Sequence, residues 1–242
     1  MKNFFPKEYK KNRKLKINHS YLVEQFSDYT KIFREIEKVV KKGDYTLGQK
    51  VDECEKNFAK RTGSKFAISV GNGTDALFLA LKAMNIGKND EVITACNSFY
   101  ASAGAIKACD AKPVFVDCDN TFCMDTTLVE EKITEKTKAL LPVHFTGYMT
   151  DMRNLSKISE KYNIPVVEDA CQSILSAIDE KNAGTWGYAG AFSLHPLKNI
   201  NVWSDGGVIV TNDSNLDNKL RLLRNHGLED RSTVTLMGYN SR

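Results

Sequence analysis

The sequence predicts an α/β fold with a mainly parallel sheet between two layers of helices. From residue 66 onward, short apolar runs alternate with segments whose apolar residues follow a helical period. Such repetition of strand and helix is typical of parallel sheets, whose connecting helices cover both faces. A length of 242 residues suffices for one large domain with a substantial core.

The elements can be assigned in chain order. Segment 29–40 repeats its apolar residues at helical spacing, and a glycine-containing break at 43–48 separates it from a second helix that runs through Phe58. The expected strands are 66–70, 91–95, 113–116, 138–143, 164–168, 191–194 and 207–211. The further helices expected are 74–84, 101–108, 125–133, 151–162 and 215–225. Little room remains for a helix between the last two strands.

The composition is that of an ordinary soluble protein, with 42% hydrophobic and 26% charged residues. No apolar run approaches the roughly 20 residues that a membrane-spanning helix needs. The start of the chain lacks an apolar core followed by a small-residue cleavage site, so no secretory signal is expected. We therefore expect a cytoplasmic protein with no membrane partner.

The six cysteines are scattered, without a Cys-x-x-Cys pair or a histidine cluster. This pattern predicts no metal site and no disulfide framework, and mostly buried, reduced thiols are the simpler interpretation.

Much of the net charge of +4 comes from a basic run within residues 1–27, an N-terminal tail and lead-in. Such a run could contact nucleic acid or an anionic membrane. No pattern of basic and aromatic residues continues into the body of the chain, so a solvated tail without a nucleic-acid partner is expected. Nucleic-acid binding would instead give a salt-sensitive affinity that disappears when residues 1–16 are removed.

A glycine-rich loop, 71–76, follows the first expected strand of the sheet and opens a helix. It fits a dinucleotide fingerprint loosely, but the next strand ends without the acidic residue that would bind ribose. An anion site remains possible, because small residues such as Gly73 and Thr74 at a helix N-terminus expose backbone N–H groups to a phosphate. The alternative is a tight turn in which Thr74 caps the helix.

A lysine and a carboxylate lie at the ends of two expected strands. Lys198 occupies a short turn between an apolar strand and a glycine pair, and Asp169 ends another buried strand. A lysine that forms a Schiff base and an aspartate that holds the proton on a pyridine nitrogen would suit pyridoxal 5'-phosphate (PLP). The alternatives are a solvated lysine and a carboxylate that caps the following turn.

Other side chains near strand ends are weaker candidates. Phe99 could stack on a planar ring or belong to the core, and Gln172 could reach the same ligand as Asp169. A site role also stays open for His144 and His195, which lie at expected strand ends, although no histidine has metal-ligand spacing.

Taken together, these motifs resemble the DegT/DnrJ/EryC1/StrS family of PLP-dependent nucleotide-sugar aminotransferases, whose fold is that of type I aminotransferases. The resemblance extends over residues 28–242. The motifs that carry it are Gly71-Asn72-Gly73-Thr74-Asp75-Ala76-Leu77, Asn97-Ser98-Phe99-Tyr100-Ala101, His144-Phe145-Thr146-Gly147, Glu168-Asp169-Ala170-Cys171-Gln172-Ser173, Ser193-Leu194-His195-Pro196-Leu197-Lys198-Asn199, Asp205-Gly206-Gly207, Arg224-Asn225-His226-Gly227 and Gly238-Tyr239-Asn240-Ser241-Arg242.

The resemblance implies a role for each matching residue. Lys198 would be the catalytic lysine that binds the cofactor, and Asp169 the partner of its ring nitrogen. The other implied cofactor contacts are Gln172 at the ring hydroxyl, Phe99 stacked on the ring, Gly73, Thr74 and Ser193 at the phosphate, and Asn240 at the phosphate of a neighbouring subunit. A homodimer with shared sites follows from the last of these.

The resemblance also implies a reaction in which an amino acid, with glutamate as the expected donor, supplies nitrogen to a nucleotide-linked keto sugar. Some relatives carry histidine in place of Lys198 and dehydrate sugars, so transamination is favoured over dehydration. A relative that binds PLP without catalysis is the other alternative, because family members usually continue into a smaller C-terminal domain whereas this sequence ends at Arg242. Residues 28–242 would then be the large, cofactor-binding domain.

Overall fold

The computed structural model describes residues 20–242, which divide into two compact units, one up to Gly43 and one from Asp44 onward. The described part of the first unit contains helices α1 (Leu22–Gln25) and α2 (Tyr29–Lys42), neither of which has a buried residue. Gly43 ends α2 with a φ of 68°, a left-handed conformation that favours glycine. Most of the expected basic tail lies outside the described residues.

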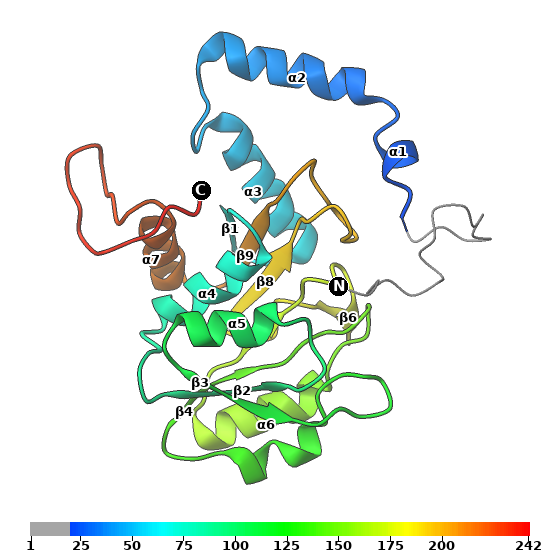
Figure 1. Ribbon diagram of the computed structural model, residues 1–242, viewed down its shortest axis with the longest axis vertical. Helices are drawn as coiled ribbons and strands as arrows, with labels where there is room; N and C mark the ends of the chain where they lie inside the picture. Colours follow the sequence, from blue (N-terminus) through cyan, green and yellow to red (C-terminus); the bar gives the residue numbers. More distant parts are fainter. Residues whose placement is uncertain (1–19) are drawn as a thin grey trace, which may run out of the picture. The chain divides into compact units, whose positions relative to one another are not determined.

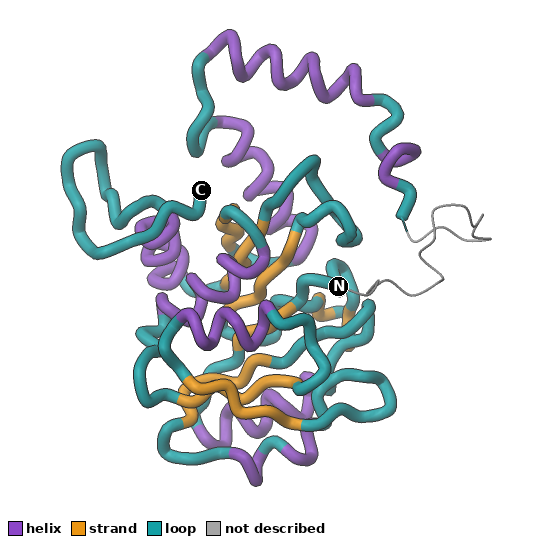
Figure 2. The backbone as a smooth tube through the Cα atoms, viewed as in Figure 1, coloured by secondary structure: helices purple, strands orange, loops and turns teal. Residues whose placement is uncertain are grey.

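The second unit contains the sheet, drawn in Figures 1 and 2. Its main strands are β1 (Phe66–Val70), β2 (Glu91–Ala95), β3 (Lys112–Val116), β4 (Thr137–Leu141), β5 (Val167–Asp169), β8 (Ala189–Ser193) and β9 (Gly207–Thr211). A short hairpin of β6 (Ala177–Ile178) and β7 (Lys181–Asn182) lies outside it.

The strands form one continuous sheet. A four-stranded part, β1-β9-β8-β5, and a three-stranded part, β3-β2-β4, are joined by parallel bridges from Leu140 to Val166 and from Val143 to Asp169. The order is therefore β1-β9-β8-β5-β4-β2-β3. Only β9 runs antiparallel to its neighbours β1 and β8, and the other pairs described are parallel. The expected mainly parallel sheet is confirmed, and the carboxyl ends of all its strands except β9 share one edge.

The helices of this unit begin and end at residues suited to those positions. They are α3 (Gln49–Thr62), α4 (Gly73–Ala83), α5 (Ala101–Ala108), α6 (Met152–Tyr162) and α7 (Ser214–Arg224). Side chains of Asn72, Asp151 and Asp213 cap three of them by accepting first-turn N–H groups. The helix expected at 74–84 thus has Asn72 as its cap, and Thr74 lies within its first turn.

Both faces of the sheet are buried, because neighbouring residues along a strand point to opposite sides. Ile68, Ala191 and Ile209 belong to the larger core, which includes residues of α4 and α7. The intervening Val208 and Val210 belong to a second core with Phe58 of α3. Figure 1 shows α5 and α6 on opposite faces of the part formed by β2, β3 and β4. Helices therefore cover the sheet on both sides.

One expected element is wrong. Segment 125–133 forms two short 3-10 helices, η2 (Thr126–Leu128) and η3 (Glu130–Lys132), in place of one α-helix. The Asp125 side chain accepts both the N–H and the hydroxyl of Thr127, which stabilises a local turn in competition with the α-helical pattern. Among the described residues, no helix is long and apolar enough to cross a membrane.

Candidate active site at the carboxyl edge of the sheet

A cavity of about 610 Å³ lies where β1, β2, β5 and β8 end. Ligands of open α/β sheets bind in this position, beyond the carboxyl ends of the strands. The expected site residues that line it are Gly73, Thr74, Phe99, Asp169, Gln172, Ser193 and Lys198. Residues separated by more than half of the sequence thus share one cavity.

The N-terminus of α4 forms one wall. Asn72 Oδ1 accepts the N–H of Asp75 at 2.8 Å, and the first-turn N–H groups of a helix have no partner within the helix. Gly73 lies directly against β8, since a Cβ built on it would be 2.6 Å from Cβ of Ser193. The absence of a side chain at Gly73 therefore lets the start of α4 pack directly on β8, so that the helix N-terminus and Ser193 line the same cavity.

Asp169 brings a buried carboxylate to the cavity and is 6% exposed. Its Oδ2 accepts the hydroxyl of Ser102 at 2.7 Å, and its Oδ1 accepts the N–H of Cys171 at 3.2 Å. Such donors offset the cost of burying a carboxylate. Asp169 also keeps lone pairs that can accept a further hydrogen bond from a ligand.

Cys171 lines the same cavity, and its thiol stays protonated. Burial raises the pKa of Cys171 well above its usual range, the charge of Asp169 raises this pKa further, and only Lys198 opposes the rise. A thiol is a poor nucleophile compared with a thiolate. Cys171 therefore serves as a small wall residue beside Asp169.

Lys198 is half-buried on the connection between β8 and β9. Its backbone N–H donates to the carbonyl of His195 at 2.8 Å, which fixes the turn that carries it, and Leu194 N–H donates to the carbonyl of Gly206 across the connection. The lysine also lines a second cavity of about 310 Å³, together with Gln172 and Thr146. Its side chain is therefore accessible from two sides.

Gln172 has a defined orientation. Its Oε1 accepts the N–H of Thr146 at 3.3 Å, so its amide NH₂ remains as a donor. Phe99 is 56% exposed and its ring packs against that of Tyr100, with centroids 4.1 Å apart. An exposed ring at the cavity wall is available to a planar ligand.

Asn240 is the expected site residue that does not line this cavity. It is exposed, and its backbone forms an antiparallel bridge with Asn225. Next to it, Ser241 donates to Asp75 Oδ2 at 2.6 Å and accepts the N–H of Gly71 through its carbonyl. The end of the chain thus binds the loop that leads into α4, while Asn240 faces outward.

The two histidines expected at strand ends, His144 and His195, differ in their position relative to the cavity. His195 lines the cavity, whereas His144 is fully buried and lies outside the set of lining residues. His144 Nδ1 accepts the N–H of Thr150, so its ring proton lies on Nε2, 2.9 Å from Glu168. Glu168 also accepts the N–H groups of residues 184, 186 and 187, which gives this pair a structural role.

Several residues at the site were not predicted. Asp205 and Tyr100 line the cavity, while Ser102 on α5 does not line it but donates to Asp169. The only sequence signal for Ser102 is its place directly after the Asn97–Ala101 motif. A hydroxyl on a helix is too common for this signal to have singled it out.

The fold and the cavity define an α/β domain with a cavity between a lysine, a buried carboxylate and a helix N-terminus. The chain belongs to the DegT/DnrJ/EryC1/StrS aminotransferase family, whose model matches residues 27–242.

Similar proteins agree with this membership. The pleiotropic regulatory protein of Geobacillus stearothermophilus is 42% identical over 212 residues, which are 87% of this chain and 57% of that protein. The dTDP-3-amino-3,4,6-trideoxy-alpha-D-glucose transaminase of Micromonospora megalomicea subsp. nigra is 39% identical over 225 residues, 92% of this chain and 60% of the transaminase. The chain therefore spans less than two thirds of the length of these relatives.

Solved structures share the fold. S. venezuelae DesV, determined in complex with a ketimine intermediate, gives a TM-score of 0.89 at 35% identity, covering 93% of this chain and 62% of DesV. NtdA from Bacillus subtilis, determined with bound PMP, gives 0.87 at 31% identity and covers 97% of this chain and 55% of NtdA. The sheet with its antiparallel β9 is thus the architecture of a type I aminotransferase domain.

Proposed function

We propose that this chain binds PLP and takes part in the transfer of an amino group to a nucleotide-linked keto sugar. One observation carries the proposal: Lys198 and the buried Asp169 line a single cavity, which also contains the N-terminus of α4. These are the reactive amine, the carboxylate and the anion-binding wall that PLP requires.

The donor set of the cavity fits the cofactor. First-turn N–H groups at Gly73 and Thr74 and the hydroxyl of Ser193 would hold the phosphate, because the lack of a side chain at Gly73 lets the helix N-terminus and Ser193 share one wall of the cavity. Asp169, itself fixed by Ser102 and Cys171, would accept a hydrogen bond from the protonated ring nitrogen and so keep the proton on it. The NH₂ group of Gln172 would donate to the ring oxygen, and Phe99 would cover the ring face.

When bound, PLP supplies an electron sink for charge that develops at the substrate carbon. The part played by this chain is to bind, orient and move a proton. Lys198 would hold the cofactor covalently through Nζ, and the same Nζ, once released, would carry a proton between the substrate carbon and the cofactor. Its access to both cavities supports this double role.

The substrate class follows from relatives. Those with a sugar in their names include the transaminase of M. megalomicea and a UDP-2-acetamido-2-deoxy-3-oxo-D-glucuronate aminotransferase of Pseudomonas aeruginosa that is 38% identical. For this chain we propose a nucleotide-linked keto sugar as acceptor, glutamate as donor and the cytoplasm as location.

A homodimer is part of the proposal. Asn240 is exposed and does not line the cavity of its own chain, and the apolar residues Ile32, Ile36 and Val39 of α2 are not buried. An exposed apolar stripe on a helix is suited to contact with a second copy. Asn240 would then reach the phosphate held by the partner subunit.

Borohydride trapping tests the central claim. Purified protein mixed with PLP should develop visible absorbance, and borohydride should fix the cofactor on Lys198, as located by peptide mass spectrometry. Lys198→Ala should abolish both signals while the far-UV circular dichroism stays unchanged. The control Lys107→Ala alters an exposed lysine on α5 and should behave like the parent.

Glutamate separates binding from transfer. Its addition should remove the visible absorbance and release 2-oxoglutarate in an amount equal to the bound cofactor. A protein that binds PLP through Lys198 but never responds to glutamate would be a cofactor binder without this transfer activity. A protein that takes up no PLP would refute the proposal.

A further inference from the structure

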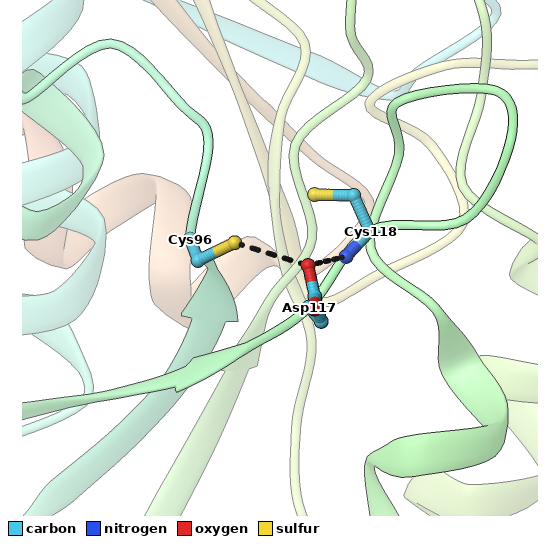
Figure 3. A group of neighbouring side chains, drawn as sticks. All are labelled: Cys96, Asp117 and Cys118. Carbon is cyan, nitrogen blue, oxygen red and sulfur yellow. Dashed lines mark hydrogen bonds between the residues drawn. The ribbon is translucent and has the colours of Figure 1, made fainter.

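Three potential metal ligands meet beside the sheet edge, although one of them is distant in sequence from the other two. Cys96 follows β2, and Asp117 and Cys118 follow β3 (Figure 3). Their ligand atoms, two sulfurs and a carboxylate oxygen, lie within 4.8 Å of one another. None of the three lines the cofactor cavity. The expectation of no metal site rested on local spacing, which cannot reveal residues brought together by strand pairing.

The backbone around the three residues is fixed by hydrogen bonds. Strands β2 and β3 pair up to Ala95 and Val116, and the N–H of Cys96 continues the ladder to the carbonyl of Val116 at 3.0 Å. On the other side, Cys118 forms an antiparallel bridge with Met124. Ligands on rigid strand ends need little reorganisation to bind an ion.

The distances suit a tetrahedral ion. With Zn–S near 2.3 Å and Zn–O near 2.0 Å, a sulfur and an oxygen on adjacent corners are about 3.5 Å apart. The observed distance between Cys96 Sγ and Asp117 Oδ1 is 3.6 Å. Two thiolates on adjacent corners are about 3.8 Å apart by the same geometry, which is within the span of the cluster.

We propose that Cys96, Asp117 and Cys118 form a Zn²⁺ site. Both cysteines would bind as thiolates, each releasing its proton to solvent, and one oxygen of Asp117 would be the third ligand. Cys96 and Asp117 are exposed and Cys118 is half-buried, so the ion can enter and water can fill the fourth corner. Sulfur ligands select zinc over the hard cations Mg²⁺ and Ca²⁺.

The proposed zinc ion would have a structural role that follows from its place between two strand ends. An ion at this point joins the ends of β2 and β3 and restrains the segment that leads to Phe99 and α5. It would therefore stabilise one wall of the cofactor cavity without contacting the ligand in it.

Cobalt titration tests the site independently of PLP. Metal-free protein of the full chain, kept reduced with a phosphine, is titrated with Co²⁺ and measured as a difference spectrum. We expect one Co²⁺ per chain, with thiolate charge-transfer and tetrahedral d–d bands that Zn²⁺ removes. Cys96→Ser and Cys118→Ser should each weaken binding at least about tenfold, the loss that even an outer hydrogen-bond partner of a ligand can cause.

Cys54→Ser is the matched control, because Cys54 is exposed on α3 and distant in sequence from the cluster; it should leave the titration unchanged. Two results overturn the proposal. One is the absence of thiolate bands in the parent protein kept reduced, whether or not its two cysteines form a disulfide when the phosphine is left out. The other is a set of bands that survives both cluster substitutions in variants with native circular dichroism.

Discussion

At the scale of single residues, Asp169 depends on a neighbour from another element. The hydroxyl of Ser102 on α5 is 1% exposed and donates to Asp169, while it also exchanges a hydrogen bond with Ser98 at 2.6 Å. This arrangement holds the carboxylate in one orientation within a buried environment. The proposed contact with a ring nitrogen therefore relies on a serine that never touches the ligand.

Ser102→Ala should lower the free energy of unfolding by about 1 to 3 kcal/mol, the usual loss when a buried charged acceptor loses a donor. PLP affinity should fall as well, because Asp169 gains freedom to turn. Urea unfolding and PLP titration measure the two effects. Ser98→Ala is the control, since Ser98 contacts Ser102 and has no recorded bond to the carboxylate. Equal losses in both variants would contradict this role of Ser102.

Sequence patterns reveal residues at strand ends better than residues that act across elements. Asp169 and Lys198 were predicted because each follows an apolar run, and the structure places both at the cavity. Ser102 was missed because its partner is 67 positions away, and no local pattern encodes that contact. The roles assigned to the lining residues remain predictions for the experiments above.

At the scale of elements, α4 packs very closely against β8. Gly73 begins the helix at a point where a Cβ would meet Ser193 Cβ at 2.6 Å and Cys171 Sγ at 3.1 Å. The wall of the cavity therefore depends on two elements that approach more closely than side chains normally allow.

Gly73→Ala should displace the start of α4 and cost about 1 to 3 kcal/mol in the free energy of unfolding, as overpacking does. PLP affinity should fall with it. Gly104→Ala is a matched control within helix α5, where an added Cβ meets nothing within 4 Å. That control should gain about 0.5 to 1 kcal/mol from the lower entropy of its unfolded chain. Thermal unfolding and PLP titration of both variants measure these effects. A Gly73→Ala protein with the stability and PLP affinity of the parent would contradict the packing argument.

Most elements could be predicted because their periodicity is strong. Strands 66–70, 91–95 and 207–211 and helix 101–108 have the expected bounds. The prediction of one α-helix over 125–133 was wrong because an apolar pattern of helical period carries no information on the hydrogen bonds that the Asp125 side chain accepts from Thr127.

At the scale of the whole domain, Glu55 joins three elements. It lies on α3, accepts the N–H and hydroxyl of Ser69 on β1, and forms ion pairs with Arg221 and Arg224 on α7. Burial by itself would raise the pKa of Glu55. Hydrogen bonds from Ser69 and Arg221 and the charge of Arg224 outweigh burial and lower this pKa below its ordinary value.

This shift predicts an acid-sensitive domain. A carboxylate whose pKa is lower in the folded state stabilises the fold above its unfolded pKa, about 4.3 for glutamate, and loses that contribution as the pH falls through the folded pKa. Glu55→Gln should therefore be less stable than the parent at pH 7 and lose less stability between pH 6 and 3. Urea unfolding across this range measures the pH dependence of stability. Glu53→Gln is the control, because Glu53 lies on the same helix, is only half-buried and pairs with the exposed Lys50. Parallel pH profiles for parent and Glu55→Gln would refute the assignment.

The mainly parallel class of the sheet could be predicted from the sequence, but the order of its strands could not. Alternation of strands and helices indicates parallel pairing, whereas nothing in the residues of β9 shows that it lies between β1 and β8. That position is set by pairing of Phe66 with Thr211, a contact between distant parts of the chain.

The position of β9 in the sheet has a consequence for folding during synthesis on the ribosome. Strands β1 and β8 are synthesised before β9, yet in the sheet β9 lies between them and pairs with both. At the start of β9, Gly207 packs so closely on the loop before α4 that a Cβ on it would be 2.3 Å from the carbonyl oxygen of Asn72. The cavity walls from β1 and β8 therefore reach their places only after residues 207–211 have emerged and inserted. Since such distant pairings form slowly, we expect cofactor capture only after β9 has emerged, and a nascent chain stalled before residue 207 to remain colourless.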